Sequence, residues 1–237
     1  MINNKVVHLA YRSIFLALSF MGLLESFGLF AGQKFGFDCL LYYTTLSNIL
    51  CFGVMIVVWI YNIKEVMKGD LIGNNQKLHQ LKFYATIAIL VTFLVYNFLL
   101  TDNMFSSGWN NLGNLTKHIF CPLLFVIDFL LFDRHHGLKW YDCLLCTVLP
   151  LLYVIVILIR GAILPTDYEG TVYPYFFLNA RELGYGGVVV WVIILVIIFV
   201  IIAGLFYLFD KVERKDGKFI FYFKNTENKT LDTNMEE

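Results

Sequence analysis

The chain has 237 residues, of which 59% are hydrophobic and 15% are charged, and its mean hydropathy is +0.69. A soluble domain is about half apolar and about a quarter charged, so the composition excludes an ordinary soluble domain. The formal net charge is zero, and no basic patch, Gly-rich phosphate loop or zinc motif suggests nucleic-acid, nucleotide or metal binding.

The apolar residues are grouped in six runs, and each can cross a hydrocarbon core that needs about 20 helical residues. The runs cover residues 6–32, 39–63, 83–100, 115–132, 141–162 and 184–209. The alternating pattern of a membrane β-barrel is absent. The first run is too long for a cleavable signal peptide and contains Glu25. We therefore expect an all-α polytopic protein with one six-helix domain over residues 1–210, followed by a polar tail over residues 211–237.

The basic residues predict the orientation of these helices. With the N-terminus inside, fourteen of the eighteen Lys and Arg residues lie on the inner side and four on the outer side. The positive-inside rule then predicts that both termini are cytoplasmic. The Asn- and Lys-rich composition fits a bacterial protein, so the expected location is the bacterial plasma membrane.

Polar side chains from five of the expected helices fall at one depth in the outer leaflet. At a rise of about 1.5 Å per residue, this layer contains Glu25, Thr45, Asn97, His118 and Arg160. Polar groups inside a bilayer are costly and usually tied to function. The sequence therefore predicts one polar pocket that opens toward the outer side.

Two residues in this layer have neighbours on the same helix that bear on their interpretation. Asn48 lies one helical turn deeper than Thr45, on the same face. Hydroxyls and amides also act as packing contacts between membrane helices, which is the alternative for this group. Four residues after His118, Pro122 has no N–H for the His118 carbonyl, so we expect a bend or a free carbonyl there.

A second polar layer lies toward the inner side. Arg12 in the first run and Asp128 in the fourth lie at similar depth from that side. An unpaired charge in the membrane is expensive, so we expect a structural ion pair between them. A proton relay is the alternative, but no chain of acidic and histidine residues leads outward from this pair.

The sequence predicts no metal ion and no cofactor. Cys143 and Cys146 form a C-x-x-C, but no second pair of metal spacing accompanies them, so apolar packing is the favoured interpretation. The adjacent His135 and His136 are interpreted as part of a solvated turn. The aromatic segment 219–223 belongs to the tail, which we expect to be disordered or to lie on the membrane surface.

The order of several short segments resembles a known family. These segments are Tyr43-Thr44-Thr45-Leu46-Ser47-Asn48, His118-Ile119-Phe120-Cys121-Pro122, Asp128-Phe129-Leu130-Leu131-Phe132, Arg160-Gly161-Ala162 and Tyr173-Pro174-Tyr175. Over roughly residues 8–210 the chain resembles the bacterial branch of the androgen-induced and androgen-dependent membrane proteins. Their animal members are six-helix threonine hydrolases that split fatty acid esters of hydroxy fatty acids. The resemblance implies a catalytic pair formed by Thr45 and His118. The chain departs from the animal members at Ser47, where they carry a bulky aromatic residue, and by having Thr44 as a second hydroxyl.

Ester chemistry suggests roles for Asn48 and for four residues of the outer layer. Thr45 is a weak nucleophile that needs an adjacent base, and His118 can supply it. Asn48 is expected to stabilise the oxyanion, and Glu25 to orient His118. Arg160 is expected to bind a lipid carboxylate.

Three functions remain open at this stage. The leading one is an intramembrane hydrolase of a lipid-like ester. The alternatives are a non-enzymatic protein that binds a lipid or a partner in the same pocket, and a small-solute or proton transporter. The largely apolar middles of the third, fifth and sixth runs argue against transport, and the sequence does not indicate the oligomeric state.

Overall fold

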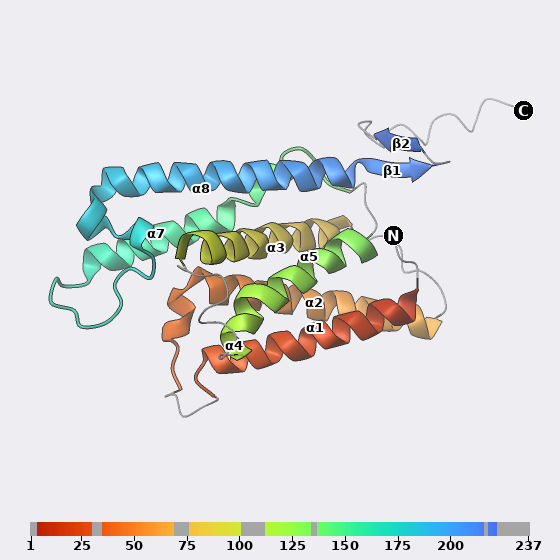
Figure 1. The fold of residues 1–237 in the computed structure, drawn as a ribbon, viewed down its shortest axis with the longest axis horizontal. Coiled ribbons are helices and arrows are strands. Elements are labelled where there is room, and N and C mark those ends of the chain that lie inside the picture. Colours follow the sequence, from red (N-terminus) through yellow and green to blue (C-terminus); the bar gives the residue numbers. More distant parts are fainter. Residues whose placement is uncertain are drawn as a thin grey trace, which may run out of the picture.

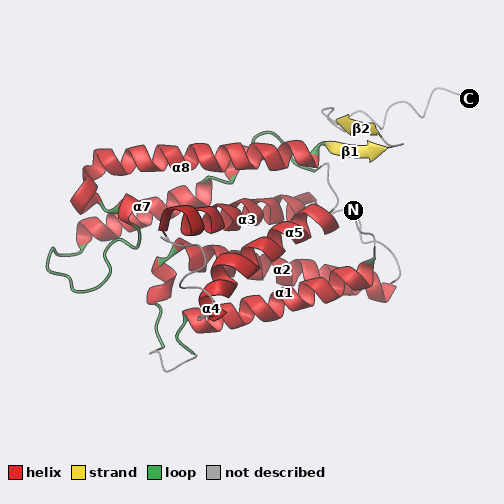
Figure 2. Cartoon of the chain, in the orientation of Figure 1, coloured by secondary structure: helices red, strands yellow, loops and turns green. Residues whose placement is uncertain are grey.

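The computed structural model describes residues 4–29, 35–68, 76–100, 112–133, 137–215 and 218–221. The α-helices are α1 (Lys5–Ser26), α2 (Tyr43–Lys68), α3 (Gln76–Val95), α4 (Leu112–Leu115), α5 (Cys121–Phe132), α6 (Asp142–Leu145), α7 (Val148–Ile163) and α8 (Ala180–Asp210). Two 3-10 turns are η1 (Asp38–Leu41) and η4 (Phe176–Leu178), and two π-helical turns are η2 (Tyr96–Leu100) and η3 (Thr116–Phe120). Apart from a short hairpin after α8, the regular elements of the described chain are helices joined by loops (Figure 2).

Six helices are long and apolar enough to cross a membrane, which confirms the expected polytopic all-α fold. The spans are Lys5–Ser26, Tyr43–Met67, Gln76–Leu100, Gly113–Phe132, Asp142–Ile163 and Ala180–Asp210. Three of them are composite, because α3 continues into η2, α4 and η3 precede α5, and α6 precedes α7. Two of these breaks carry candidate residues, since Asn97 lies in η2 and His118 lies in η3.

Successive spans run in opposite directions, so α1 begins and α8 ends on the same side of the bundle (Figure 1). We call this side the terminal end, and the side where α1 ends and α2 begins the cavity end. Helix α1 packs against α2 and α5, α2 against α3, and α3 against both α5 and α8. Helices α7 and α8 lie along the other side of α3 from α1 (Figure 1).

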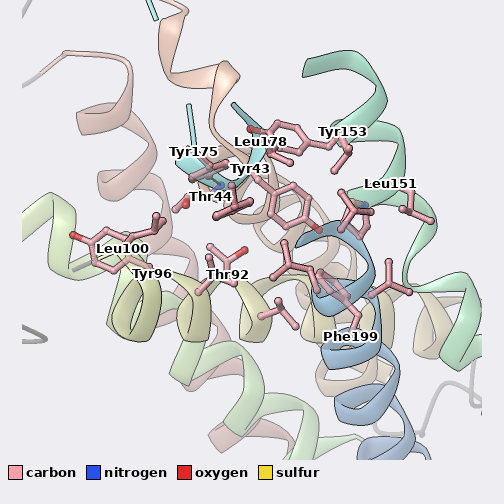
Figure 3. A pocket seen from close by; sticks show the side chains of 18 residues that line it. Tyr43, Thr44, Thr92, Tyr96, Leu100, Leu151, Tyr153, Tyr175, Leu178 and Phe199 are labelled. Atoms are coloured by element: carbon pink, nitrogen blue, oxygen red, sulfur yellow. Dashed lines mark hydrogen bonds between the residues drawn. The ribbon is translucent and has the colours of Figure 1, made fainter. Parts of the chain in front are cut away.

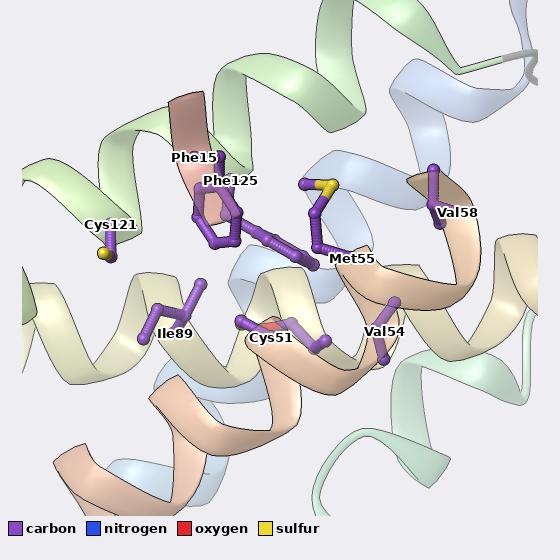
Figure 4. Packing of buried hydrophobic residues seen from close by; sticks show 9 residues of the cluster. Phe15, Cys51, Val54, Met55, Val58, Ile89, Cys121 and Phe125 are labelled. Atoms are coloured by element: carbon purple, nitrogen blue, oxygen red, sulfur yellow. The ribbon is translucent and has the colours of Figure 1, made fainter. Parts of the chain in front are cut away.

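The centre of the bundle is packed with apolar side chains from α1, α2, α3 and α5. Phe15, Met55, Ile89 and Phe125 are fully buried in one cluster (Figure 4). Because lipid is as apolar as these side chains, close packing rather than burial from water stabilises contacts between membrane helices. This cluster holds together the four helices that carry the candidate site.

Several boundaries differ from the apolar runs for local reasons. Helix α1 ends at Ser26 rather than near residue 32, and Gly28 follows with φ 77°, the left-handed conformation of a helix C-terminus. Helix α3 begins at Gln76, so its polar first turns precede the apolar run. Within α8, Gly184 has φ 66° and ψ 164°, which kinks the helix where the sixth run begins.

The first residues of the tail form a hairpin rather than disordered chain. Strands β1 (Val212–Lys215) and β2 (Lys218–Phe221) pair antiparallel, with Lys215 opposite Lys218. The two residues between the strands, Asp216 and Gly217, lie outside the described part of the chain. Residues 222–237 lie outside the described part of the chain.

Candidate functional site

A polar cavity of about 510 Å³ lies at the cavity end of the bundle. Its walls come from the end of α1, from η1 and the first turn of α2, from η2, from η3 and from the segment that leads into η4. Thr45 and His118 both line it. Two residues 73 positions apart in the sequence, on different helices, therefore face one space.

Thr45 lies in the first turn of α2, where its amide donates to the Tyr42 carbonyl at 3.0 Å. Its side chain is buried, and no hydrogen bond from its hydroxyl to any residue that the structure describes is present. Thr44 is more tightly engaged, because its carbonyl accepts from Ser47 and Asn48 and its amide donates to the Tyr175 hydroxyl. These bonds involve the backbone of Thr44, and both threonines line the polar cavity.

His118 is buried in η3 and its ring stacks on the ring of Tyr96. The two ring centroids lie 3.4 Å apart at an interplanar angle of 13°. Within the described part of the chain, Nδ1 of His118 is buried without a hydrogen-bond partner. Among the described residues, the imidazole is thus held by stacking on Tyr96, and its Nδ1 remains unbonded.

Two asparagines bond the backbone around His118. Pro122 has no N–H to donate to the carbonyls four and five residues before it, those of His118 and Lys117. Asn97 Nδ2 donates to the His118 carbonyl at 3.3 Å, and Asn48 Nδ2 donates to the Lys117 carbonyl at 3.2 Å. The expected free carbonyl is therefore bonded, and the expected bend takes the form of the π-helical turn η3. π-Helical turns are frequent at functional sites.

This arrangement changes the roles expected for Asn48 and Glu25. Asn48 Nδ2 also donates to the Thr44 carbonyl at 2.8 Å, so its amide links α2 to η3 and does not serve an oxyanion. Glu25 pairs with Lys117, whose Nζ lies 2.6 Å from Oε2, and does not orient His118. Gly113 allows this pair to form, because a Cβ there would overlap the Glu25 carboxylate.

Arg160 lies apart from the polar cavity. Its guanidinium carbon is 5.5 Å from the centre of the Tyr168 ring, and its Nη1 is buried without a hydrogen-bond partner among the described residues. Arg160 is not among the residues that line the cavity. The expected layer of five polar groups therefore converges only in part: Thr45 and His118 line the cavity, while Asn97 and Glu25 support η3.

Tyr175 is a site residue that the sequence interpretation did not single out. It lines the polar cavity, and its hydroxyl accepts from the Thr44 amide at 3.4 Å. Burial raises the pKa of Tyr175, and hydrogen bonds from Thr44 only partly offset this effect, so the hydroxyl keeps its proton at neutral pH. Its hydrogen is available as a donor inside the cavity. Its place in the Tyr173-Pro174-Tyr175 segment was the one available signal in the sequence.

An apolar pocket of about 70 Å³ adjoins the polar cavity (Figure 3). Its lining comes from α2, α3 with η2, α7, η4 and α8. Thr44, Tyr96, Leu100 and Tyr175 line both spaces, so they form the boundary between them. Together the two spaces provide a polar part next to the candidate chemistry and an apolar part that extends between helices.

A buried ionic cluster lies toward the terminal end, well separated along the helices from the polar cavity. Arg12 Nε lies 3.0 Å from Asp128 Oδ1, so the structure contains the ion pair expected between these residues. Lys82 contacts both Asp128 and Asp133, and His79 Nε2 lies 2.9 Å from Asp210 Oδ1. The cluster links α1, α3, α5 and α8 through charges that are almost fully buried.

Among the described residues, no group of three or more His, Cys, Asp or Glu side chains could hold a metal ion. Cys143 and Cys146 are buried free thiols, and Cys146 Sγ donates to the Cys143 carbonyl. His135 and His136 lie outside the described residues.

Comparisons of the chain with protein-family models, with curated proteins and with solved structures found no match.

Proposed function

We propose that the protein is an intramembrane hydrolase of a lipid-like ester, with Thr45 as nucleophile and His118 as general base. The observation that carries this proposal is that both side chains line one polar cavity, with the Thr45 hydroxyl not bonded to any described residue. A threonine hydroxyl needs an adjacent base, and a neutral imidazole is suited to that role. The sequence resemblance to six-helix threonine hydrolases agrees with this pairing.

The reaction follows from the residues of the cavity. The Thr45 hydroxyl attacks the ester carbonyl carbon, and its proton passes to a ring nitrogen of His118. The tetrahedral oxyanion accepts a hydrogen bond from the Tyr175 hydroxyl. The carbon–oxygen bond to the alcohol then breaks, and the alcohol takes the proton from His118. Water, activated by His118 in the same way, releases the acyl group from Thr45 as a fatty acid.

The substrate class is supported by the apolar pocket beside the polar cavity. A ligand that fills both spaces has a polar ester near Thr45 and a hydrocarbon part between the helices. We place the protein in a bacterial plasma membrane with the polar cavity toward the outer leaflet, because this orientation puts fourteen of eighteen basic residues inside. No metal or cofactor enters the proposed reaction.

The second candidate is a membrane protein that binds a lipid without cleaving it. One observation favours it: no hydrogen bond joins the Thr45 hydroxyl to the His118 ring, although the structure describes both residues. Catalytic hydrogen bonds are often loose before substrate binds, so this geometry does not exclude catalysis.

The two candidates are separated by an assay of ester hydrolysis with purified protein in detergent. The substrate is a fatty acid ester of a hydroxy fatty acid, and Thr45→Ala and His118→Ala are compared with wild type. We expect turnover to fall by about 10³-fold or more in each variant. Thr147→Ala is the matched control, because Thr147 is a buried threonine near the terminal end whose hydroxyl donates to the Leu144 carbonyl three residues before it. Wild-type turnover that survives both site variants, or no turnover with several lipid esters, favours the lipid-binding protein.

A further inference from the structure

The lining residues show where the apolar pocket ends inside the bundle. On α3, α7 and α8 the lining residues nearest the terminal end are Val91, Pro150 and Phe199. Phe199 lies at the bottom of the pocket in Figure 3, opposite Tyr43 and Tyr175. It is only 4% exposed and belongs to the same packed cluster as Phe83 and Phe129, so its ring is fixed in place.

The walls of the pocket present mainly hydrocarbon surface, even where they carry hydroxyl groups. The Thr92 hydroxyl donates to the Ala88 carbonyl at 2.9 Å, and the Tyr153 hydroxyl donates to the Leu41 carbonyl at 2.8 Å. The Tyr175 hydroxyl is at the boundary with the polar cavity. A ligand inside the pocket therefore meets methyl groups and ring faces, which favour a hydrocarbon occupant.

The pocket lies between helices that contact membrane lipid, so lipid acyl chains are the hydrocarbon available to it. The outer faces of α7 and α8 expose large apolar side chains such as Leu152, Ile155, Val190 and Ile197, as expected of helices that contact lipid. The pocket between these helices is therefore in the hydrocarbon layer, where acyl chains are abundant. From Val192 to Phe199 along α8, it extends roughly 10 Å at 1.5 Å per residue.

We propose that the apolar pocket binds a single hydrocarbon chain whose methyl end lies against Phe199, and that Phe199 sets the chain length the protein accepts. The chain passes the boundary formed by Thr44, Tyr96, Leu100 and Tyr175, and its polar head lies in the polar cavity. This proposal rests on the proposed function, because the hydrocarbon chain is the part of the ester substrate that the protein would recognise. Binding of the chain does not itself require that the ester be cleaved.

The test is a binding measurement that does not depend on turnover. Purified protein is titrated with saturated fatty acids of increasing length, and the affinity of each is measured by displacement of a photoreactive fatty acid. The wild-type affinity should rise with each methylene up to a limit, by about fourfold per group, which corresponds to about 0.8 kcal/mol. Phe199→Ala should move the limit to longer chains, and Phe199→Trp should move it to shorter ones.

The matched control is Ile197→Ala, an apolar position two residues away on α8 that is exposed on the outer face. It should leave the length limit unchanged. A photoreactive group at the methyl end of the chain should label the peptide that contains Phe199 in wild type. The proposal is overturned by a length limit that does not respond to either Phe199 variant, by an equal shift in Ile197→Ala, or by labelling confined to the outer faces of α7 and α8.

The binding measurement and the hydrolysis assay can give different results, so each tests its own proposal. A length limit that shifts with Phe199 in a protein without turnover supports the chain-binding site and rejects the hydrolase. Turnover that needs Thr45 and His118 but has no length limit supports the hydrolase and rejects the role of Phe199.

Discussion

The side-chain amide of Asn97 lies 3.3 Å from the carbonyl oxygen of His118, and it reaches this oxygen at the point where Pro122 cannot donate an N–H. A helix interior normally loses stability at proline because a carbonyl is left without its partner. Here a residue of a neighbouring helix supplies the missing donor. The backbone of the candidate base is therefore fixed to η2, which also carries Tyr96 and Leu100 of the boundary between the two spaces.

This relationship predicts a coupling between Asn97 and Pro122. Asn97→Leu leaves buried carbonyls without a donor, so we expect the free energy of unfolding to fall by about 1–3 kcal/mol. Pro122→Ala restores a backbone N–H in the first turn of α5 and should recover part of this loss. The four proteins of the double-mutant cycle are compared by unfolding in detergent, and we expect a coupling of about 1 kcal/mol.

A matched control for this cycle is Asn62→Leu. Asn62 is equally buried and donates to a backbone carbonyl across helices, that of Lys5, but no proline lies near that bond in the sequence. Pro122→Ala should not rescue Asn62→Leu. Equal rescue of both asparagine variants, or purely additive effects of Asn97→Leu and Pro122→Ala, contradicts the prediction.

The ionic cluster predicts a strong dependence of stability on Lys82. This residue contacts two buried carboxylates, Asp128 and Asp133, and removing one partner of a buried ion pair leaves an uncompensated charge. We expect Lys82→Met to lower the free energy of unfolding by about 3–5 kcal/mol, as measured in detergent. Lys77→Met is the control, since Lys77 is exposed on the same helix and should have little effect. A loss in Lys82→Met no larger than that in the control would show that the cluster contributes nothing to stability.

The carboxyl group of Asp133 should make the stability of the fold depend on pH in acid. Burial alone raises the pKa of a carboxyl group, but Lys82, His79 and Arg12 outweigh burial and hold the pKa of Asp133 well below its usual range. A carboxyl whose pKa is lower in the folded state stabilises the fold above its ordinary pKa of about 4. That contribution declines below about pH 4 and is lost as the pH falls through the folded pKa.

The measurement is the midpoint of thermal unfolding between neutral pH and about pH 3. Wild type should lose stability more steeply than Asp133→Asn below about pH 4, because the variant has no carboxyl to protonate at this position. The difference between the two proteins isolates Asp133 from the other carboxylates. Parallel curves for both proteins are incompatible with a lowered pKa at this residue.

The membrane fold and much of the site could be predicted from the sequence because both depend on local signals. Apolar runs of membrane-spanning length identify the six helices, and helical rise places Thr45 and His118 at one depth. Depth alone does not give the direction of a side chain around its helix. Arg160 shares the layer but does not line the cavity, and Glu25 faces Lys117 rather than His118.

The remaining features depend on contacts between distant segments. The stacking of Tyr96 on His118, and the position of Tyr175 next to Thr44, arise from how η2 and the segment before η4 pack onto α2 and η3. No spacing in the sequence indicates these contacts. The apolar pocket is likewise formed by helices far apart in the chain. The position of Phe199 at its end therefore cannot be predicted from the sequence of any one helix.

The stacked pair of Tyr96 and His118 gives the last prediction. Parallel rings at 3.4 Å restrict the imidazole to one orientation, and an aromatic pair is worth about 0.5–1.5 kcal/mol, which is up to about tenfold in a rate or an equilibrium. Tyr96→Ala should therefore reduce kcat for ester hydrolysis by up to about tenfold. Tyr96→Phe keeps the ring and loses only the hydroxyl, which accepts from Asn114, so it should stay close to wild type.

A second measurement, independent of turnover, is the rate at which diethylpyrocarbonate modifies His118, followed by mass spectrometry of its peptide. This rate should rise in Tyr96→Ala and not in Tyr96→Phe, because only the alanine variant uncovers a face of the imidazole. Equal modification rates in all three proteins would mean that the tyrosine ring does not hold His118.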